Sequence, residues 1–176
     1  RDALFGLGAL IPAAPAQAQA QAEVPPEVAA ELPAAALQGS GQLTFLTLKV
    51  YDIRLWSNQP PGEDYTRTAL ALELQYARKL AGRKIAERSL DEMRRIGEFS
   101  ELQAERWLAG MTGLFPDVAA GDRITGVQRG GTARFHTNGR FRGEVADAEF
   151  TRLFFGIWLS PRSSEPELRQ ALLRRS

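Results

Sequence analysis

A change of hydrophobic period between Thr68 and Gly97 constrains the fold of this chain more than any other feature. In its first part, apolar residues fill every second position, as in a strand with one apolar face: Leu70, Leu72, Leu74 and Tyr76. After Gly82 the apolar spacing becomes that of an amphipathic helix: Ala86, Leu90, Met93 and Gly97. The sequence therefore predicts a strand that leads directly into a helix.

The connection between this strand and this helix carries one phenol and several cations: Tyr76, Arg78, Lys79, Arg83 and Lys84. A phenol and cations at the end of an apolar strand face can meet a small acidic ligand. The alternative is that these side chains are solvated residues at a strand end. Further along the helix, Asp91, Glu92, Arg94 and Arg95 are interpreted as an ordinary solvated run of charges.

The flanking sequence predicts more strands on both sides of this unit. Residues that favour β-structure indicate strands near 41–46 and 48–57, and one face of the second strand carries Lys49, Tyr51, Ile53 and Leu55. A β-meander is expected over 122–145, with the hairpin signal Asn138-Gly139 between its last two strands.

Three further helices are expected from their N-terminal signals. Ser100 begins one helix with a capping-box pattern, and Asp147 is expected to cap the next. A last helix is expected over 164–175, where Ser164 and Glu167 have the spacing of a second capping box. Runs of strands followed by runs of helices favour an α+β fold, an antiparallel sheet with helices packed on one side.

Residues 1–22 have the pattern of a secretory signal peptide: a charged start, a short apolar run, and small-residue cleavage patterns such as Ala16-Gln17-Ala18. No Met precedes them, so we expect a signal peptide truncated at its start; a disordered Ala/Gln tail is the alternative. Residues 23–36 are interpreted as a proline-containing linker or lead-in, and residues 37–176 as one domain. We expect a periplasmic or secreted mature protein without a membrane span.

Composition argues against several classes of site. The chain has 22 basic and 21 acidic residues, a balance that gives no support to nucleic-acid binding. It has no cysteine, and its single histidine, His136, cannot form a multi-histidine metal site. No phosphate-binding loop, dinucleotide fingerprint or hydrolase motif occurs. We therefore expect no metal and no cofactor, and we expect His136 to be structural or exposed.

Three segments in order resemble proteins of the chalcone isomerase fold, most closely their exported bacterial branch. They are LKVYDIRLW, LQYARKLAGRKIAERSLDEMRRIG, and the stretch from GDRITGV to FFGIWLSP, so that the similarity covers about residues 37–165. The resemblance implies an open-faced β-sandwich, in which a layer of helices covers an antiparallel sheet and a ligand cleft lies between them. Plant enzymes of this family close chalcones into flavanones, and its fatty-acid-binding members hold a carboxylate with an arginine and a tyrosine.

When the positions are matched one by one, few of the family's catalytic residues are present in this chain. The family tyrosine falls on Tyr76, the asparagine seven residues later falls on Arg83, and the strand threonine falls on Lys49. The arginine of the glycine-rich lead-in has no clear counterpart, because Gln42 or Thr44 stands there. We therefore expect little or no chalcone cyclisation.

The first functional hypothesis is a periplasmic protein that binds a fatty acid or a similar amphipathic anion. The ligand-binding residues would be Tyr76, Arg83, Lys49 and Tyr51, with cations for the carboxylate and apolar strand faces for the tail. A second hypothesis is an isomerase or lyase acting on an unidentified enone-like substrate, in which Lys49 or Arg83 polarises a carbonyl and Tyr76 donates a proton. A third is a structural or partner-binding protein with a closed cleft. The sequence identifies neither the ligand nor the oligomeric state.

Overall fold

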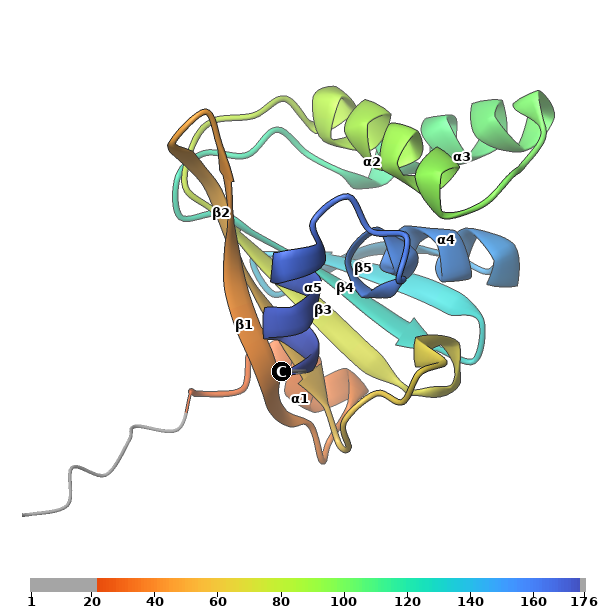
Figure 1. The fold of residues 1–176 in the computed structure, drawn as a ribbon. Coiled ribbons are helices and arrows are strands. Elements are labelled where there is room, and N and C mark those ends of the chain that lie inside the picture. Colours follow the sequence, from red (N-terminus) through yellow and green to blue (C-terminus); the bar gives the residue numbers. More distant parts are fainter. Residues whose placement is uncertain (1–21, 175–176) are drawn as a thin grey trace, which may run out of the picture.

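The computed structural model describes residues 22–174, which are organised around one six-stranded antiparallel sheet (Figure 1). The strands are neighbours in chain order: β1 (Ala36–Phe45), β2 (Leu48–Ser57), β3 (Leu70–Tyr76), β4 (Arg123–Arg129), β5 (Thr132–Thr137) and β6 (Arg140–Val145). A short 3-10 helix, η1 (Tyr65–Arg67), lies between β2 and β3. The expected signal peptide, residues 1–22, falls outside the described residues except for Ala22.

Four helices form a layer over one face of this sheet: α2 (Gly82–Ile96), α3 (Glu101–Leu114), α4 (Ala148–Leu159) and α5 (Pro166–Leu173) (Figure 1). α5 packs on β1, α4 packs on β5, and α2 packs against both α3 and α4. This is the predicted α+β fold, an open-faced sandwich. None of the described helices is long and apolar enough to cross a membrane.

The main core lies between the helix layer and the inner face of the sheet. Because strand side chains alternate between faces, β2 and β3 bury every second residue here, including Ile53, Leu55, Leu70 and Leu72. Phenylalanines from α4, from β5 and from the residue after α3 fill one end of this core with their rings in mutual contact: Phe150, Phe154, Phe135 and Phe115. That end of the sandwich is therefore closed by aromatic packing.

The predicted N-terminal signals of α3 and α4 are confirmed, and that of α5 is wrong. Ser100 and Gln103 form the reciprocal capping box of α3, and the Asp147 side chain accepts bonds from the first amides of α4. At α5 the cap residue is Glu165, and it makes no side-chain cap bond. The Ser164 hydroxyl instead donates to Glu92 of α2 at 2.7 Å, so a tertiary partner replaces the local one.

The segment expected as a linker contains a further helix, α1 (Pro26–Glu31), which packs on the opposite face of the sheet. Helices are therefore not confined to one side. A second apolar cluster forms there between α1, the residues after it and the strands: Val28, Leu32, Ala35, Trp56, Ala71 and Val127. The prolines that suggested a linker instead begin this helix, with Pro26 at its first position, where the missing amide leaves no bond unmade.

Buried ion pairs hold α1 on the sheet. Glu27 is buried and accepts hydrogen bonds from Arg123 Nε and Nη2, each at 3.0 Å, and from the Thr125 hydroxyl at 2.8 Å. His136 is also buried on this face, with Nε2 3.5 Å from Glu31 Oε1, and burial lowers its pKa. His136 is therefore a structural residue, as expected.

We predict that Glu27→Ala lowers the free energy of unfolding by about 3 kcal/mol, because it removes the nearest acidic partner of the partly buried Arg123 guanidinium and the acceptor of the Thr125 hydroxyl. Arg123 then keeps only Glu73 Oε1, at 3.6 Å. Urea denaturation measures the change. The matched control is Glu23→Ala, since Glu23 is exposed and makes no ion pair with a described residue; it should change stability by less than about 0.5 kcal/mol. Equal effects of the two substitutions would show that α1 is not held by this pairing.

Candidate functional site

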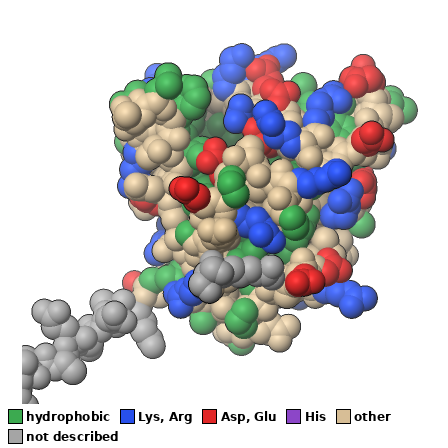
Figure 2. Space-filling model, viewed as in Figure 1, with side chains coloured by type: hydrophobic (Ala, Val, Ile, Leu, Met, Phe, Trp, Pro, Cys, Tyr) green, Lys and Arg blue, Asp and Glu red, His purple; other side chains and the backbone are tan. Residues whose placement is uncertain are grey.

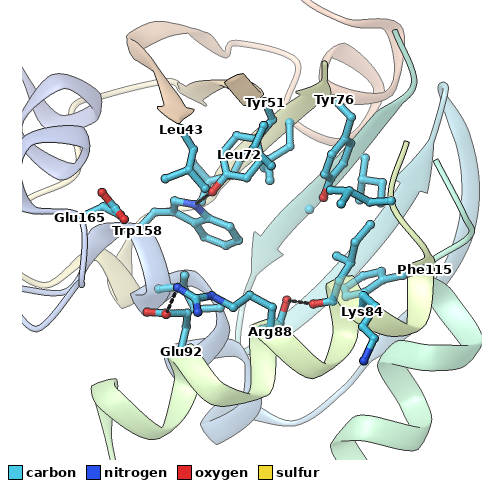
Figure 3. A pocket seen from close by; sticks show the side chains of 18 of the residues that line it. Leu43, Tyr51, Leu72, Tyr76, Lys84, Arg88, Glu92, Phe115, Trp158 and Glu165 are labelled. Carbon is cyan, nitrogen blue, oxygen red and sulfur yellow. Dashed lines mark hydrogen bonds and ion pairs between the residues drawn. The ribbon is translucent and has the colours of Figure 1, made fainter. Parts of the chain in front are cut away.

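A cavity of about 420 Å³ lies between the helix layer and the sheet, beyond the phenylalanine-filled end of the core (Figure 3). Its floor is apolar and comes from the sheet and from α4: Leu72, Leu74, Ile124, Phe135, Phe154 and Ile157. Its volume falls within the range of about 300–1,000 Å³ that is typical of small-molecule sites. The cavity can therefore hold an apolar group of ordinary ligand size.

Two tyrosines form the polar part of the strand wall. Tyr51 of β2 and Tyr76 of β3 are paired across the two strands, and their ring centroids lie 5.8 Å apart in an edge-to-face arrangement. Trp158 Nε1 donates to the Tyr51 hydroxyl at 3.0 Å, which ties α4 to β2. Tyr76 is 4% exposed, and its hydroxyl points into the cavity with no hydrogen-bond partner among residues 22–174 (Figure 3).

Both cavity phenols are held in the neutral form. Burial raises the pKa of Tyr51 to about 12, against the opposing effect of the bond from Trp158. Burial also raises the pKa of Tyr76, and the neighbouring Tyr51 adds to the shift. A neutral phenol is a hydrogen-bond donor, so Tyr76 can donate to an acceptor atom of a molecule in the cavity.

The facing wall is formed by α2 and carries charged side chains (Figure 3). Arg88 Nη2 lies 2.7 Å from Glu92 Oε1, and Lys84 Nζ lies 2.9 Å from Glu87 Oε2. The third cation that lines the cavity, Arg78, follows β3 and has no acidic partner in the described part of the chain. Arg78 is therefore the lining cation whose charge is free to pair with an anion.

The structure brings Tyr51 and Tyr76 together as predicted and places Lys49 outside the cavity wall. In the β1–β2 pairing, Leu43 faces Tyr51 and the next residue, Thr44, faces Lys49, so that Val50 is an extra residue in β2. Such a bulge shifts the alternation of side chains by one position. Val50 therefore lines the cavity, and Lys49 pairs with Asp52 at 2.5 Å.

Arg83 also lies outside the cavity wall. The lining face of α2 includes Ile85, and Arg83 is two residues earlier, about 200° away around the helix. Its Nε lies 2.9 Å from Glu87 Oε1, and its side chain is 72% exposed. The amide at the start of the helix is occupied too, because Gly82 N donates to Asp117 Oδ1 at 2.8 Å. A ligand-binding role for Lys49 or Arg83 stays a prediction, without support from their positions.

Glu92 is a cavity-lining residue that differs from its expected place in a solvated charge run. It is 5% exposed and lines the cavity, where it pairs with Arg88. The available signal was its spacing, since Glu92 follows Ile85 by seven residues and so lies on the same face of the helix. Among residues 22–174, no group of three or more acidic or histidine side chains is placed to hold a metal ion.

Comparison with known proteins agrees with this architecture. A family model described as chalcone isomerase-like matches residues 16–174. An uncharacterized protein of Haemophilus influenzae is 27% identical over 135 residues, 77% of this chain, and the chain spans 66% of the length of that relative. The crystal structure of a fatty-acid binding protein of Arabidopsis thaliana is similar with a TM-score of 0.64 at 15% identity, covering 80% of this chain and 87% of that one.

The buried phenols predict an unusual alkaline titration. The chain has three tyrosines, and burial also raises the pKa of the third, Tyr65, to about 12. The folded protein should therefore form almost no tyrosinate at pH 10, whereas the chain unfolded in guanidinium chloride should be about half ionised there. Because the folded values lie above the unfolded one, this contribution to stability is complete below pH 10 and decreases as the pH rises toward 12. Ultraviolet absorbance of tyrosinate measures the titration, and a folded protein that titrates near pH 10 would contradict the burial of the phenols.

Proposed function

The chain belongs to the chalcone isomerase-like family, and from this premise we propose that it binds a fatty acid or a similar amphipathic anion in the cavity between sheet and helices. The observation that carries the proposal is an apolar cavity with a free phenol and an uncompensated cation in its wall. The tail would lie along Leu72 and Phe135, and the anionic head would accept from the Tyr76 hydroxyl and pair with Arg78. The name of the Arabidopsis neighbour, a fatty-acid binding protein, agrees with this class of ligand.

The two alternative functions have less support. In the isomerase hypothesis, Lys49 or Arg83 polarises a carbonyl of the substrate, but neither side chain lines the cavity. Tyr76 remains as a neutral hydrogen-bond donor, which suits the recognition of an acceptor atom. A purely structural role with a closed cleft does not account for an open cavity of about 420 Å³. Binding of an amphipathic anion uses the apolar floor, the Tyr76 hydroxyl and the Arg78 charge.

Isothermal titration calorimetry with dodecanoate tests the proposed contacts. Arg78→Gln should weaken binding about ten- to a hundredfold, because a charge-assisted bond is lost. Tyr76→Phe should weaken it about three- to tenfold, through loss of one neutral hydrogen bond.

Each variant has a matched control in the chain. Arg83→Gln changes an exposed arginine that is paired with Glu87, and Tyr65→Phe changes a phenol whose hydroxyl donates to the Arg152 carbonyl. Neither control residue lines the cavity, so neither should change the affinity. Equal binding by wild type and Arg78→Gln would contradict the assignment, and a loss of affinity in Arg83→Gln alone would support Arg83, the cation expected from the sequence.

We also propose that the protein works in the periplasm after export. The proposal is supported by the signal-peptide pattern of residues 1–22. In a Gram-negative host that expresses the gene with its natural start, N-terminal sequencing of periplasmic protein should give a chain that begins near Glu23. Protein that keeps Arg1, or that is found only in the cytoplasm, would contradict export.

A further inference from the structure

The turn between β1 and β2 exposes large apolar side chains. Phe45 is 66% exposed, Leu46 is 78% exposed and Leu48 is 54% exposed. Among residues 22–174 only two other large hydrophobic side chains are comparably exposed, Leu102 and Phe141, and they lie singly on other elements. Single exposed leucines are normal, but three apolar side chains within four positions form a patch. Figure 2 shows hydrophobic side chains gathered over this tip at the upper left of the molecule.

Folding does not explain why this turn is apolar. Leu46 and Thr47 both have positive backbone φ angles, 47° and 67°. Residues other than glycine and asparagine rarely adopt such angles. The turn between β5 and β6 also has two residues with positive φ, Asn138 and Gly139, and these residue types favour that conformation. Leu46 and Thr47 therefore disfavour the conformation of the first turn, and the exposed leucine also lowers solubility. Neither effect helps the protein to fold, so we look for a function of the exposed apolar tip.

Cations flank the apolar tip. Ala77 N donates to the Val50 carbonyl at 2.9 Å, which places Arg78 and Lys79, the next two residues, beside the base of the hairpin. Both are exposed and neither has an acidic partner in the described part of the chain. Lys49 lies on the hairpin itself, paired with Asp52. The whole chain has a net charge of only +1, so this local excess of positive charge is a property of the tip.

The hairpin that carries the tip is also a wall of the cavity. Leu43, Phe45 and Val50 line the cavity. Leu46, which follows Phe45, and Leu48, which is paired with Phe45 across the hairpin, face solvent. Figure 2 shows the surface hollowed between this hairpin and the helix layer. The exposed tip therefore stands at the opening of the cavity.

We propose that the β1–β2 tip docks on an anionic phospholipid bilayer, with Phe45, Leu46 and Leu48 among the acyl chains and Lys79 near the head groups. A bilayer can accept a wedge of three side chains, whereas a stable protein interface buries about 800 Å² on each partner. Anionic lipids attract basic residues at the surface, which matches the cations beside the tip. The docking rests on the proposed function in one respect. If the ligand is a lipid, it would enter or leave the cavity at the membrane.

Flotation with vesicles tests the docking. Wild-type protein should bind vesicles of phosphatidylglycerol and phosphatidylcholine, bind pure phosphatidylcholine more weakly, and be released by high salt. Leu46→Asn combined with Leu48→Ser should weaken binding to both kinds of vesicle about tenfold or more, since two apolar side chains no longer insert. Asparagine tolerates positive φ, so this variant should remain folded. Lys79→Glu should weaken binding about fivefold or more on the anionic vesicles alone.

The matched control is Leu102→Asn, which removes a 74% exposed leucine on α3 and should leave vesicle binding unchanged. Absence of vesicle binding by wild type overturns the proposal, as does equal binding by wild type and the tip variant. A dimer in analytical ultracentrifugation that the tip variant converts to monomer, without vesicle binding, also overturns it, because the tip would then be an interface between copies of the chain.

The two proposals fail in different ways. Leu46, Leu48 and Lys79 do not line the cavity, so these variants should bind dodecanoate in solution with wild-type affinity. Binding of dodecanoate without vesicle binding would overturn the docking and leave the proposed ligand standing. Vesicle binding that depends on the tip, without any dodecanoate binding, would support the docking and contradict the ligand.

Discussion

The requirement that one apolar face of the sheet be covered determines the rest of this structure. Every strand places alternate side chains on that face, and no helix is wide enough to cover six strands alone. Four helices together cover this face, and phenylalanines from α4 and its neighbours fill one end of the space beneath them. At the other end the strands offer Tyr51 and Tyr76, whose hydroxyls need partners. Trp158 supplies one partner, and the second hydroxyl faces the cavity, so the site is the part of the interface that packing leaves open.

The opposite face of the sheet buries charged side chains, which need partners. The alternation that buries Leu72 and Leu74 under the helices places Glu73 between them on the outer face, where it is also buried. Its carboxylate accepts from Arg54 Nη2 at 2.6 Å and from Trp56 Nε1 at 2.8 Å, so the charge is paired and hydrogen-bonded. α1 then covers an apolar strip beside these pairs. The cavity and the ion pairs of Glu27 and Glu73 thus lie on opposite faces of one sheet, and the strand wall of the cavity is largely apolar.

Much of the fold could be predicted because its signals are local. The period-two run of β3, the capping box at Ser100 and the Asn138-Gly139 turn each depend on a few neighbouring residues, and each is found as predicted. The first hairpin turn has no such signal, because Leu46 and Thr47 are not the residues that positive φ favours. α1 was missed because its stability comes from Arg123 and Thr125, almost a hundred residues away in the chain.

The site was predictable only in part for a similar reason. Tyr76 and Tyr51 follow from strand alternation, but the bulge at Val50 turns Lys49 away, and a bulge is a property of the pairing between two strands. The connection after β3 was recognised as cationic, yet its sequence could not distinguish Arg78, which lines the cavity, from Arg83, which bonds to Glu87. The side of a helix that faces a cavity depends on how the helix packs, which here involves α3 and α4.

The most direct test of the central claim is the position of a ligand in the cavity. A crystal of the protein grown with a fatty acid that carries bromine on its terminal carbon would locate the end of the tail by anomalous scattering. We expect one bromine peak among Leu72, Ile124 and Phe135, with the carboxylate within hydrogen-bond distance of the Tyr76 hydroxyl. A bromine peak on the outer surface, or an empty cavity in crystals grown with saturating ligand, would contradict it.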